Sequence, residues 1–275
     1  DLEKAGLKVV HTGLSHGTVT VIEGKTSIEV THTRLDTKTD GRHAIVTHSP
    51  DWLEDARRRD FTINTIYMDA AGALFDTLDG QADLQQGCLR FVGDADRRVR
   101  EDALRMLRYC RFLHRFGHGN IDADALAALR CNADLAQNLS GERVRAEMES
   151  ILTADGAATA CDLMQHTGLA KAACDVDFNA QLLAADGAPD RGDWLIGLAS
   201  IAPAGVANSL AKRLRLSKVE ARRLQAMDRG IDPAMPDLSS DKWQQAAWFL
   251  GDDSAAIYAV KARREKAQFS VARWH

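Results

Sequence analysis

Three adjacent arginines, Arg57–Arg59, precede Asp60 and an apolar segment that begins at Phe61. The planar fork of an arginine matches phosphate oxygens, and a carboxylate accepts a hydrogen bond from a ribose hydroxyl. The run from Arg57 to Asn64 therefore suits contact with the phosphate and ribose of a nucleotide. The alternative is a solvated charge run that leads into an apolar helix or strand.

A second cluster, Glu101–Phe112, places arginines at three-residue spacing after two acidic residues. On a helix each step of three residues drifts by about 60°. Asp102 and Arg105 are therefore predicted neighbours, whereas Arg111 lies nearly opposite Asp102. The residues between them are largely apolar, so the arginines need anionic or hydrogen-bonding partners.

Two interpretations of this cluster remain open. One is a buried ion-pair network. The other is base recognition, in which Asp102 accepts from an exocyclic amino group and Arg105 donates to a ring nitrogen or carbonyl. Together these two side chains would address the Watson–Crick edge of C or A.

Two further polar segments carry weaker information. Glu29 lies in a strand-like segment, on the face shared by Thr31 and Thr33 and opposite Val30. Such a carboxylate faces solvent, or it binds a metal when other carboxylates lie beside it. The polar turn Asp40–His43 indicates little by itself.

The elements that must position these residues predict an α+β fold. Residues 17–31 are typical of a hairpin of β-branched strands around a turn at Glu23–Lys25, and Leu2–Gly6 of a helix tail closed by glycine. From Asp96 onward apolar residues recur at three- and four-residue spacing. This period predicts helices over 101–116, 122–135 and 141–152, with Ser140 as the N-cap of the last. The remainder is predicted to be helical, with short breaks.

Composition favours a soluble globular protein. Of 275 residues, 45% are hydrophobic and 27% charged, which suffices for a core without disulfide or metal staples. No apolar run approaches the roughly 18 residues of a membrane span, and the first residues lack a signal-peptide pattern. Five isolated cysteines lack zinc-site spacing and predict reduced thiols. We therefore expect a cytoplasmic protein.

Charge is unevenly distributed along the chain. Residues 1–200 hold 22 Lys and Arg against 31 Asp and Glu, whereas residues 201–275 hold 13 against 8. A basic end on an acidic chain favours a polyanionic partner. As one helix, the segment 212–224 would present three basic residues on one side, Arg215, Lys218 and Arg222. Its apolar residues would face the core, namely Leu214, Val219 and Leu224. The alternative is a solvated helix face.

Five motifs, taken in order, resemble the bacterial class (class II) of CCA-adding tRNA nucleotidyltransferases and poly(A) polymerases. They are His16–Val21, Glu29–Asp36, Thr39–Ala44, Arg58–Asn64 and Glu101–Arg108. The segments Gly93–Arg97 and Glu142–Glu147 also fit. The resemblance is dense over residues 5–152, and beyond them only a helical character agrees.

The resemblance implies a partial nucleotidyltransferase palm of a small mixed sheet plus helices, followed by an all-helical neck, body and tail. The implied domains are residues 1–85 (palm), 86–152 (neck, binding the nucleotide base) and 153–275 (body and tail, binding RNA). The implied activity adds C, A or both from CTP and ATP to the 3′ end of tRNA, with Mg²⁺. Of two metal ions, one activates the attacking hydroxyl and the other stabilises the leaving pyrophosphate.

The resemblance also implies residue roles. Glu29 matches the third carboxylate of the catalytic metal cluster. Asp102 and Arg105 match the protein template that pairs with the base. The other implied nucleotide-binding residues are Arg59 and Asp60, which hold phosphate and ribose, and Asn64, Arg108 and Arg111.

The sequence departs from the family pattern at two places. The Asp-x-Asp metal ligands and the glycine-rich phosphate loop are expected before Leu2, and the usual Gly-Gly after the palm is Asp79-Gly80. With Glu29 as its one carboxylate of the cluster, this polypeptide is expected to bind nucleotide but transfer it poorly. The alternatives are a poly(A) polymerase, which uses ATP repeatedly, or a noncatalytic module that binds RNA or nucleotide.

Overall fold

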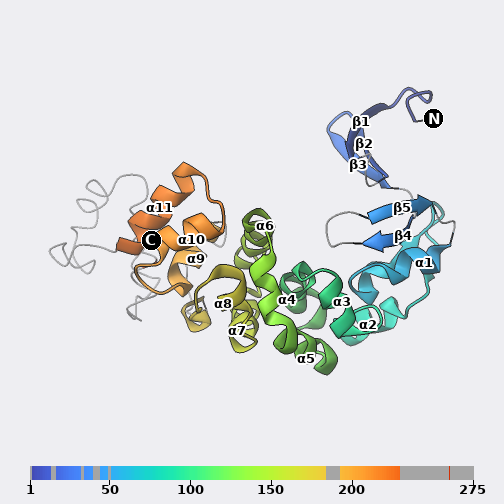
Figure 1. Cartoon of the computed structure of the whole chain (residues 1–275). Coiled ribbons are helices and arrows are strands. Elements are labelled where there is room, and N and C mark those ends of the chain that lie inside the picture. The colour runs from blue at the N-terminus through green and yellow to red at the C-terminus, as the bar shows by residue number, and fades with distance from the viewer. Residues whose placement is uncertain are drawn as a thin grey trace, which may run out of the picture. The chain divides into compact units, whose positions relative to one another are not determined.

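A computed structural model describes residues 2–13, 17–31, 34–39, 44–48, 51–183, 193–229 and 260. For residues 12–13, 34–39 and 44–48 it describes the backbone alone. Small strands precede a series of helices (Figure 1), so the predicted α+β class is confirmed. The chain divides into two compact units: residues 1–83 with 90–94, and residues 84–89 with the chain from 95 onward. The three-domain division stays a prediction.

The first unit contains three small antiparallel sheets. One has the order β1-β2-β3, from Lys8–Gly13, Thr18–Glu23 and Thr26–Thr31. The others pair β4 (Arg34–Thr39) with β5 (Ala44–His48) and β6 (Ile66–Met68) with β7 (Leu74–Asp76). β2 and β3 form the predicted hairpin, and Gly24 in its turn has a φ of 59°, which favours glycine. Residues 2–6 form a turn, in which the Gly6 N–H donates to the Glu3 carbonyl oxygen at 3.0 Å and the Leu7 N–H to that of Leu2 at 3.2 Å. With a φ of 81° at Gly6, this is the hydrogen-bond pattern of a helix end closed by glycine, as predicted.

Helix α1 (Trp52–Arg57) delivers the arginine run. The Asp51 carboxylate caps it by accepting from the Leu53 backbone N–H at 2.9 Å. A 3₁₀ helix, Thr62–Thr65, follows the run. Between the two, Phe61 is fully buried and its ring lies 5.0 Å from that of Phe91. This aromatic pair anchors the end of the arginine run in the core of the first unit.

The Asp79-Gly80 pair begins α2 (Gly80–Gln86). A Cβ on Gly80 would lie 2.3 Å from the Thr62 carbonyl oxygen, so this close approach requires glycine. Asp79 has a φ of 58°, in the left-handed region that glycine occupies most easily and aspartate tolerates. Of the two positions, Gly80 must lack a side chain, whereas position 79 accommodates the aspartate that replaces the first glycine.

The second unit is helical, and its helices follow one another along the chain (Figure 1). They are α3 (Ala95–Glu101), α4 (Leu104–Gly117), α5 (Ala123–Asn132), α6 (Gly141–Leu152), α7 (Ala157–His166), α8 (Leu169–Cys174), α9 (Trp194–Ile201), α10 (Ala207–Arg213) and α11 (Lys218–Arg229). α4 packs against α6 and α7, and its buried face includes Met106, Leu107 and Leu113. Within the described ranges, no helix is long and apolar enough to cross a membrane.

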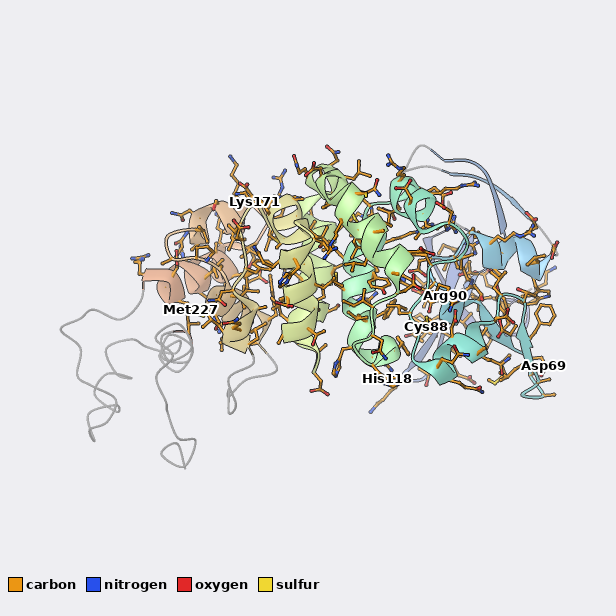
Figure 2. The ribbon with its side chains drawn as sticks, turned by 90° about the horizontal axis from the view of Figure 1, so that it is seen from below. Asp69, Cys88, Arg90, His118, Lys171 and Met227 are labelled. Atoms are coloured by element: carbon orange, nitrogen blue, oxygen red, sulfur yellow. The ribbon has the colours of Figure 1, made fainter. Side chains whose placement is uncertain are left out.

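Two boundaries in the second unit test the predicted helices. α6 begins after Ser140, whose hydroxyl accepts from the Arg143 backbone N–H at 3.4 Å, as predicted. The predicted helix 101–116 is interrupted, because α3 ends at Glu101 and α4 begins at Leu104. At the other end of α4, the ring of His118 (labelled in Figure 2) lies 2.2 Å from the position of a Cβ on Gly87. Leu89 and Phe91 form isolated bridges, to Ile121 and Phe61 respectively.

Candidate functional site

A buried carboxylate organises the arginine run in the first unit. Asp55 is 1% exposed and accepts from Arg58 Nε at 2.8 Å and from Arg59 Nε at 3.1 Å. Its Oδ2 also accepts from the Tyr67 hydroxyl at 2.9 Å, and Arg58 Nη2 makes a further short contact. The two arginines are therefore fixed side by side by one acid from the preceding turn of α1.

The predicted residues Arg59, Asp60 and Asn64 form one connected network. Arg59 Nη1 donates to the Asn64 carbonyl oxygen at 2.9 Å, and its guanidinium lies 5.0 Å from the centre of the Tyr67 ring. Asp60 Oδ1 accepts from Asn64 Nδ2 at 2.8 Å and from the Phe61 backbone N–H at 3.0 Å. The Arg59 side chain is 37% exposed, so part of its guanidinium is accessible from solvent.

The protonation equilibria of this network follow from the same contacts. Burial opposes ionisation of Asp55, but hydrogen bonds from Arg58 and Tyr67 and the charges of both arginines outweigh it and lower the pKa. Burial, together with the hydrogen bond to Asp55, raises the pKa of Tyr67 to about 12. Asp55 is thus a carboxylate and Tyr67 a neutral donor at neutral pH.

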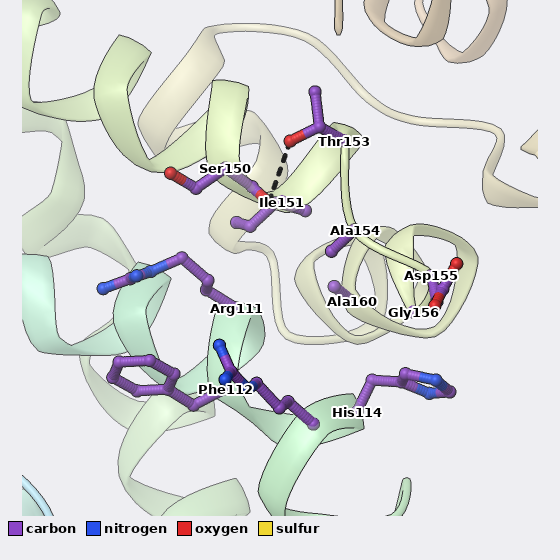
Figure 3. A pocket seen from close by; sticks show the side chains of 11 residues that line it. Arg111, Phe112, His114, Ser150, Ile151, Thr153, Ala154, Asp155, Gly156 and Ala160 are labelled. Atoms are coloured by element: carbon purple, nitrogen blue, oxygen red, sulfur yellow. Dashed lines mark hydrogen bonds between the residues drawn. The ribbon is translucent and has the colours of Figure 1, made fainter. Parts of the chain in front are cut away.

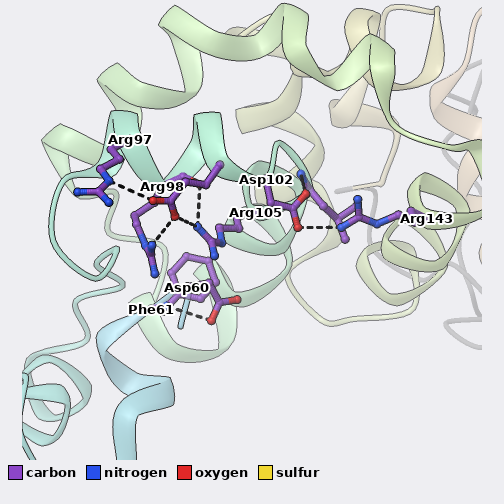
Figure 4. A network of polar contacts seen from close by, with 9 residues as sticks. Asp60, Phe61, Arg97, Arg98, Asp102, Arg105 and Arg143 are labelled. Carbon is purple, nitrogen blue, oxygen red and sulfur yellow. Dashed lines mark hydrogen bonds and ion pairs between the residues drawn. The ribbon is translucent and has the colours of Figure 1, made fainter. Parts of the chain in front are cut away.

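In the second unit Glu101 gathers three arginines (Figure 4). It accepts from Arg97 Nε at 3.1 Å and from Arg105 Nη1 at 2.9 Å, and it makes a shorter contact with Arg98 Nη1. Burial opposes ionisation of Glu101, but the hydrogen bond from Arg105 and the neighbouring positive charges lower its pKa. Arg105 also donates to the Arg98 carbonyl oxygen at 2.9 Å, so its guanidinium is held in place.

Asp102 pairs with an arginine that the sequence pattern does not single out. Its Oδ2 accepts from Arg143 Nη2 at 2.8 Å (Figure 4), and its Oδ1 accepts from the Leu104 backbone N–H at 3.1 Å. The expectation that Asp102 and Arg105 adjoin on one helix is wrong, since the helix breaks between them and Arg105 turns to Glu101. Asp102 is 31% exposed and Arg143 41%, so this pair faces solvent.

Arg108 and Arg111 share a carboxylate on α6. Arg111 Nε donates to Glu147 Oε2 at 2.8 Å, and Arg108 Nη1 lies 4.0 Å from Glu147 Oε1. Both guanidinium groups also stand over the Phe112 ring, at 5.4 Å for Arg108 and 4.2 Å for Arg111. The ion-pair network considered for this cluster therefore exists, with both arginines still partly exposed.

Glu29, the predicted catalytic and metal-binding carboxylate, lies in the middle of β3 opposite Thr20. Every residue of β3 is exposed. Among the residues that the structure describes, no three acidic, histidine or cysteine side chains gather closely enough to hold a metal ion. The described residues therefore do not form the implied metal centre.

The predicted basic stripe does not lie on one helix. α10 ends at Arg213, Arg215 occupies a left-handed conformation with φ 53°, and α11 begins at Lys218. Leu214 and Leu224 are buried as predicted, but Val219 is 67% exposed. The cause of the break is a reciprocal cap, in which Ser217 and Glu220 each accept the other's backbone N–H.

The basic side chains around this break have different surroundings. Arg213 donates to the carbonyl oxygens of Leu139 and Ala136, and Arg223 pairs with Asp193 at 2.7 Å. Arg215, Lys218 and Arg222 are all exposed. The turn Asp40–His43 and residue His16 lie outside the described residues.

Two family models match this sequence. One, the poly A polymerase head domain, matches residues 1–90, and the other, a probable RNA and SrmB-binding site of polymerase A, matches residues 120–173. The first match contains the Asp55 network, and the second contains α6 with Arg143 and Glu147. The cluster around Glu101 and the arginines of α4 lie between the two matches.

Relatives and a solved structure agree with these matches. The chain is 42% identical over 171 residues to mitochondrial CCA tRNA nucleotidyltransferase 1 of Mus musculus, covering 61% of this chain and 39% of the relative. It is 41% identical over 164 residues to the CCA-adding enzyme of Geobacillus thermodenitrificans, covering 59% and 40%. The chain thus spans about two fifths of the length of these relatives. The crystal structure of the Bacillus stearothermophilus CCA-adding enzyme in complex with CTP has a TM-score of 0.74 at 27% identity, over 98% of this chain and 67% of that one.

Proposed function

Because this chain belongs to the family of bacterial-type CCA-adding tRNA nucleotidyltransferases and poly(A) polymerases, we propose that it acts in template-independent addition of C, A or both to the 3′ end of tRNA. CTP and ATP are the proposed nucleotide substrates. The proposed activity is that of the whole protein, and this chain spans about two fifths of the length of the two relatives above.

The observation that carries the proposal is the held, partly exposed carboxylate of Asp102. A carboxylate has about four acceptor positions, of which Arg143 and Leu104 occupy two. C and A both carry an exocyclic amino group on the Watson–Crick edge, where U and G carry a carbonyl oxygen. The Asp102 carboxylate would accept a hydrogen bond from the amino group of C or A and would repel the carbonyl oxygen of U or G. Asp102 therefore supports selection of C and A without an RNA or DNA template.

Arg59 and Asp60 are proposed to hold the phosphate and ribose of the nucleotide, with Asn64 bridging them. Arg59 is already oriented by Asp55 and by the Asn64 carbonyl, and it is partly exposed. Phosphate contacts position a ligand but carry no base information. Arg105, Arg108 and Arg111 are proposed as further nucleotide contacts from α4.

Nucleotidyltransferases of this family generally use a divalent metal ion. We propose Mg²⁺, since carboxylate oxygens are hard ligands of the kind that it prefers. Glu29 is the proposed catalytic ligand from this chain. Glu29 is exposed on β3, and the described residues supply no cluster of further ligands around it.

Nucleotide selectivity tests the proposal in the purified protein. Asp102→Ala should reduce the preference for CTP and ATP over UTP and GTP by about fivefold to a hundredfold, the worth of one good base contact. Arg59→Ala is the matched control and should weaken all four nucleotides alike. An equal loss across four bases in Asp102→Ala would refute base recognition by this carboxylate.

The alternatives have their own outcomes in the same assay. Repeated incorporation of ATP with no use of CTP would identify a poly(A) polymerase. Binding of CTP and ATP by the whole protein without any incorporation, even with Mg²⁺, would identify a noncatalytic module. We also propose a cytoplasmic location. Cell fractionation should test it, since the mouse relative's name places that protein in mitochondria.

A further inference from the structure

A cavity of about 630 Å³ opens within the second unit between α4 and the segment that joins α6 to α7 (Figure 3). Its first wall comes from α4 and includes Arg111, Phe112, His114 and Arg115. Its second wall includes Ser150 and Thr153 at the end of α6. The volume lies in the range of about 300–1,000 Å³ that is typical of small-ligand sites.

The two arginines on the α4 wall differ in charge balance. Arg111 is neutralised by Glu147 at 2.8 Å. Arg115 is exposed, stands 5.2 Å over the Phe116 ring, and forms no ion pair with any residue that the structure describes. Asp155 also lines the cavity and adds a negative charge. The Arg115 guanidinium can therefore contact one phosphodiester, whereas the Asp155 carboxylate would repel the several charges of a nucleoside triphosphate.

An aromatic platform lies beside this single cation. The Arg111 guanidinium stacks on Phe112 at 4.2 Å, and Figure 3 shows both side chains on the same wall of the cavity. A ring or a guanidinium plane of this kind binds nucleobases by stacking, independently of base identity. One cation and one stacking surface together match a single nucleotide of an RNA strand.

Hydroxyl groups line the opposite wall. Ser150 Oγ donates to the Ala146 carbonyl oxygen at 3.0 Å, and Thr153 Oγ1 donates to that of Glu149 at 2.8 Å. Because each hydroxyl donates its proton to a backbone carbonyl of α6, its oxygen has lone pairs that can accept hydrogen bonds. Ribose hydroxyls and base amino groups are donors that fit them. This wall lies within residues 120–173, the segment matched by the RNA-binding family model.

We propose that this cavity binds one nucleotide of the single-stranded 3′ end of the RNA substrate, with its phosphodiester at Arg115 and its base on the Arg111 guanidinium plane that lies over Phe112. This inference rests on the proposed function. Arg115 lies eleven positions after Leu104 on α4, a rise of about 16 Å. The cavity is therefore distinct from the base-reading position at Asp102, and it holds RNA at a second point along the same helix.

Binding of a fluorescent single-stranded RNA ending in CCA, measured by anisotropy over a series of salt concentrations, tests the cavity. Arg115→Gln should weaken binding several-fold and reduce the log–log salt slope by about 0.7, the value for one phosphate contact on a single strand. Arg130→Gln, an exposed arginine near the end of α5, is the matched control and should change neither quantity. Ser150→Trp, which fills the cavity without changing charge, should weaken binding about tenfold at an unaltered slope, the loss of one stacked base.

Nucleotide incorporation on a tRNA primer, measured in parallel with the whole protein and its variants, separates the two proposals. If C and A are incorporated but Arg115→Gln and Ser150→Trp bind RNA like the parent, the cavity is refuted and the proposed function stands. If both variants lose RNA binding but no nucleotide is incorporated, the cavity is supported and the proposed function fails. Equal losses in Arg115→Gln and Arg130→Gln would mean that charge alone attracts RNA and would also overturn the cavity.

Discussion

Removal of the Asp55 carboxylate should destabilise the first unit more than any other change of one charged group in the arginine run. The carboxylate is 1% exposed and takes hydrogen bonds from Arg58, Arg59 and Tyr67. Breaking a buried ion pair by removing one partner costs about 3–5 kcal/mol. Arg58 and Arg59 are 21% and 37% exposed and regain some water, so we expect about 2–3 kcal/mol for Asp55→Ala, below the fully buried range.

The pH dependence gives a second, independent signature. Because the pKa of Asp55 is lowered on folding, its contribution is present above the usual aspartate pKa near 4 and is lost as the pH falls through the folded value. The pKa of Tyr67 is raised to about 12, so its contribution is present below about pH 10 and is lost as the pH rises toward 12. Asp55→Asn should therefore remove part of the parent's loss of stability in acid.

Urea unfolding of the parent and variants at pH 3, 5 and 7 measures both effects. Glu54→Ala is the matched control, one residue away on α1, because Glu54 pairs with the exposed Arg57 at 3.3 Å. An exposed pair of this kind contributes at most about 1 kcal/mol. Equal free energies of unfolding for Asp55→Ala and Glu54→Ala at pH 7 would show that Asp55 does not organise the run.

Two further predictions concern the second unit. Gly141→Ala should cost about 1–3 kcal/mol in thermal or urea unfolding, since its Cβ would lie 2.2 Å from the Arg213 carbonyl oxygen, and a parent-like stability would contradict this close packing. Replacing Arg215, Lys218 and Arg222 together with Gln should weaken tRNA binding without changing CTP or ATP affinity. The salt slope should then fall by about 0.7–0.9 for each phosphate that these side chains no longer bind, and an unchanged slope would identify a solvated surface.

Elements with strong local determinants could be predicted from the sequence. The β2–β3 hairpin follows from β-branched residues on both sides of Gly24. α6 begins where Ser140 can cap it and ends at Leu152, as its apolar spacing indicates. In both cases residues a few positions apart decide the structure, so no knowledge of the tertiary fold is needed.

Features that depend on distant residues could not be predicted in this way. Asp102 and Arg143 are 41 residues apart in sequence, and nothing local to either one identifies the pair. The Asp102 carboxylate also accepts from the Leu104 backbone N–H, at the start of a new helix. The spacing of apolar residues in the sequence continues across this break and does not mark it. A side chain that competes with the helix for backbone donors produces a break that apolar spacing does not reveal.

The basic segment 212–224 is a second case in which apolar spacing alone gave a wrong helix. Val219 has apolar spacing toward the core but is 67% exposed, because the Ser217–Glu220 cap starts α11 and sets its rotation. A capping box is recognisable in a sequence, and here Ser217 followed three residues later by Glu220 is one. This pattern, unlike the apolar spacing, separates Arg215 from the helix that follows.

The two interpretations of the arginines, ion-pair network and nucleotide contact, describe the same side chains under different conditions. Glu147 engages Arg111 through Nε, whereas a guanidinium has five N–H donors. The acids fix the rotamers, so a ligand meets side chains whose conformational entropy, up to about 2 kcal/mol each, is already lost on folding. The acids also neutralise charge, which lowers nonspecific attraction to polyanions. We infer that the carboxylate partners weaken the electrostatic attraction of the arginines for anions but fix the direction of their N–H donors. The direction of these donors is what distinguishes a nucleotide from other anions.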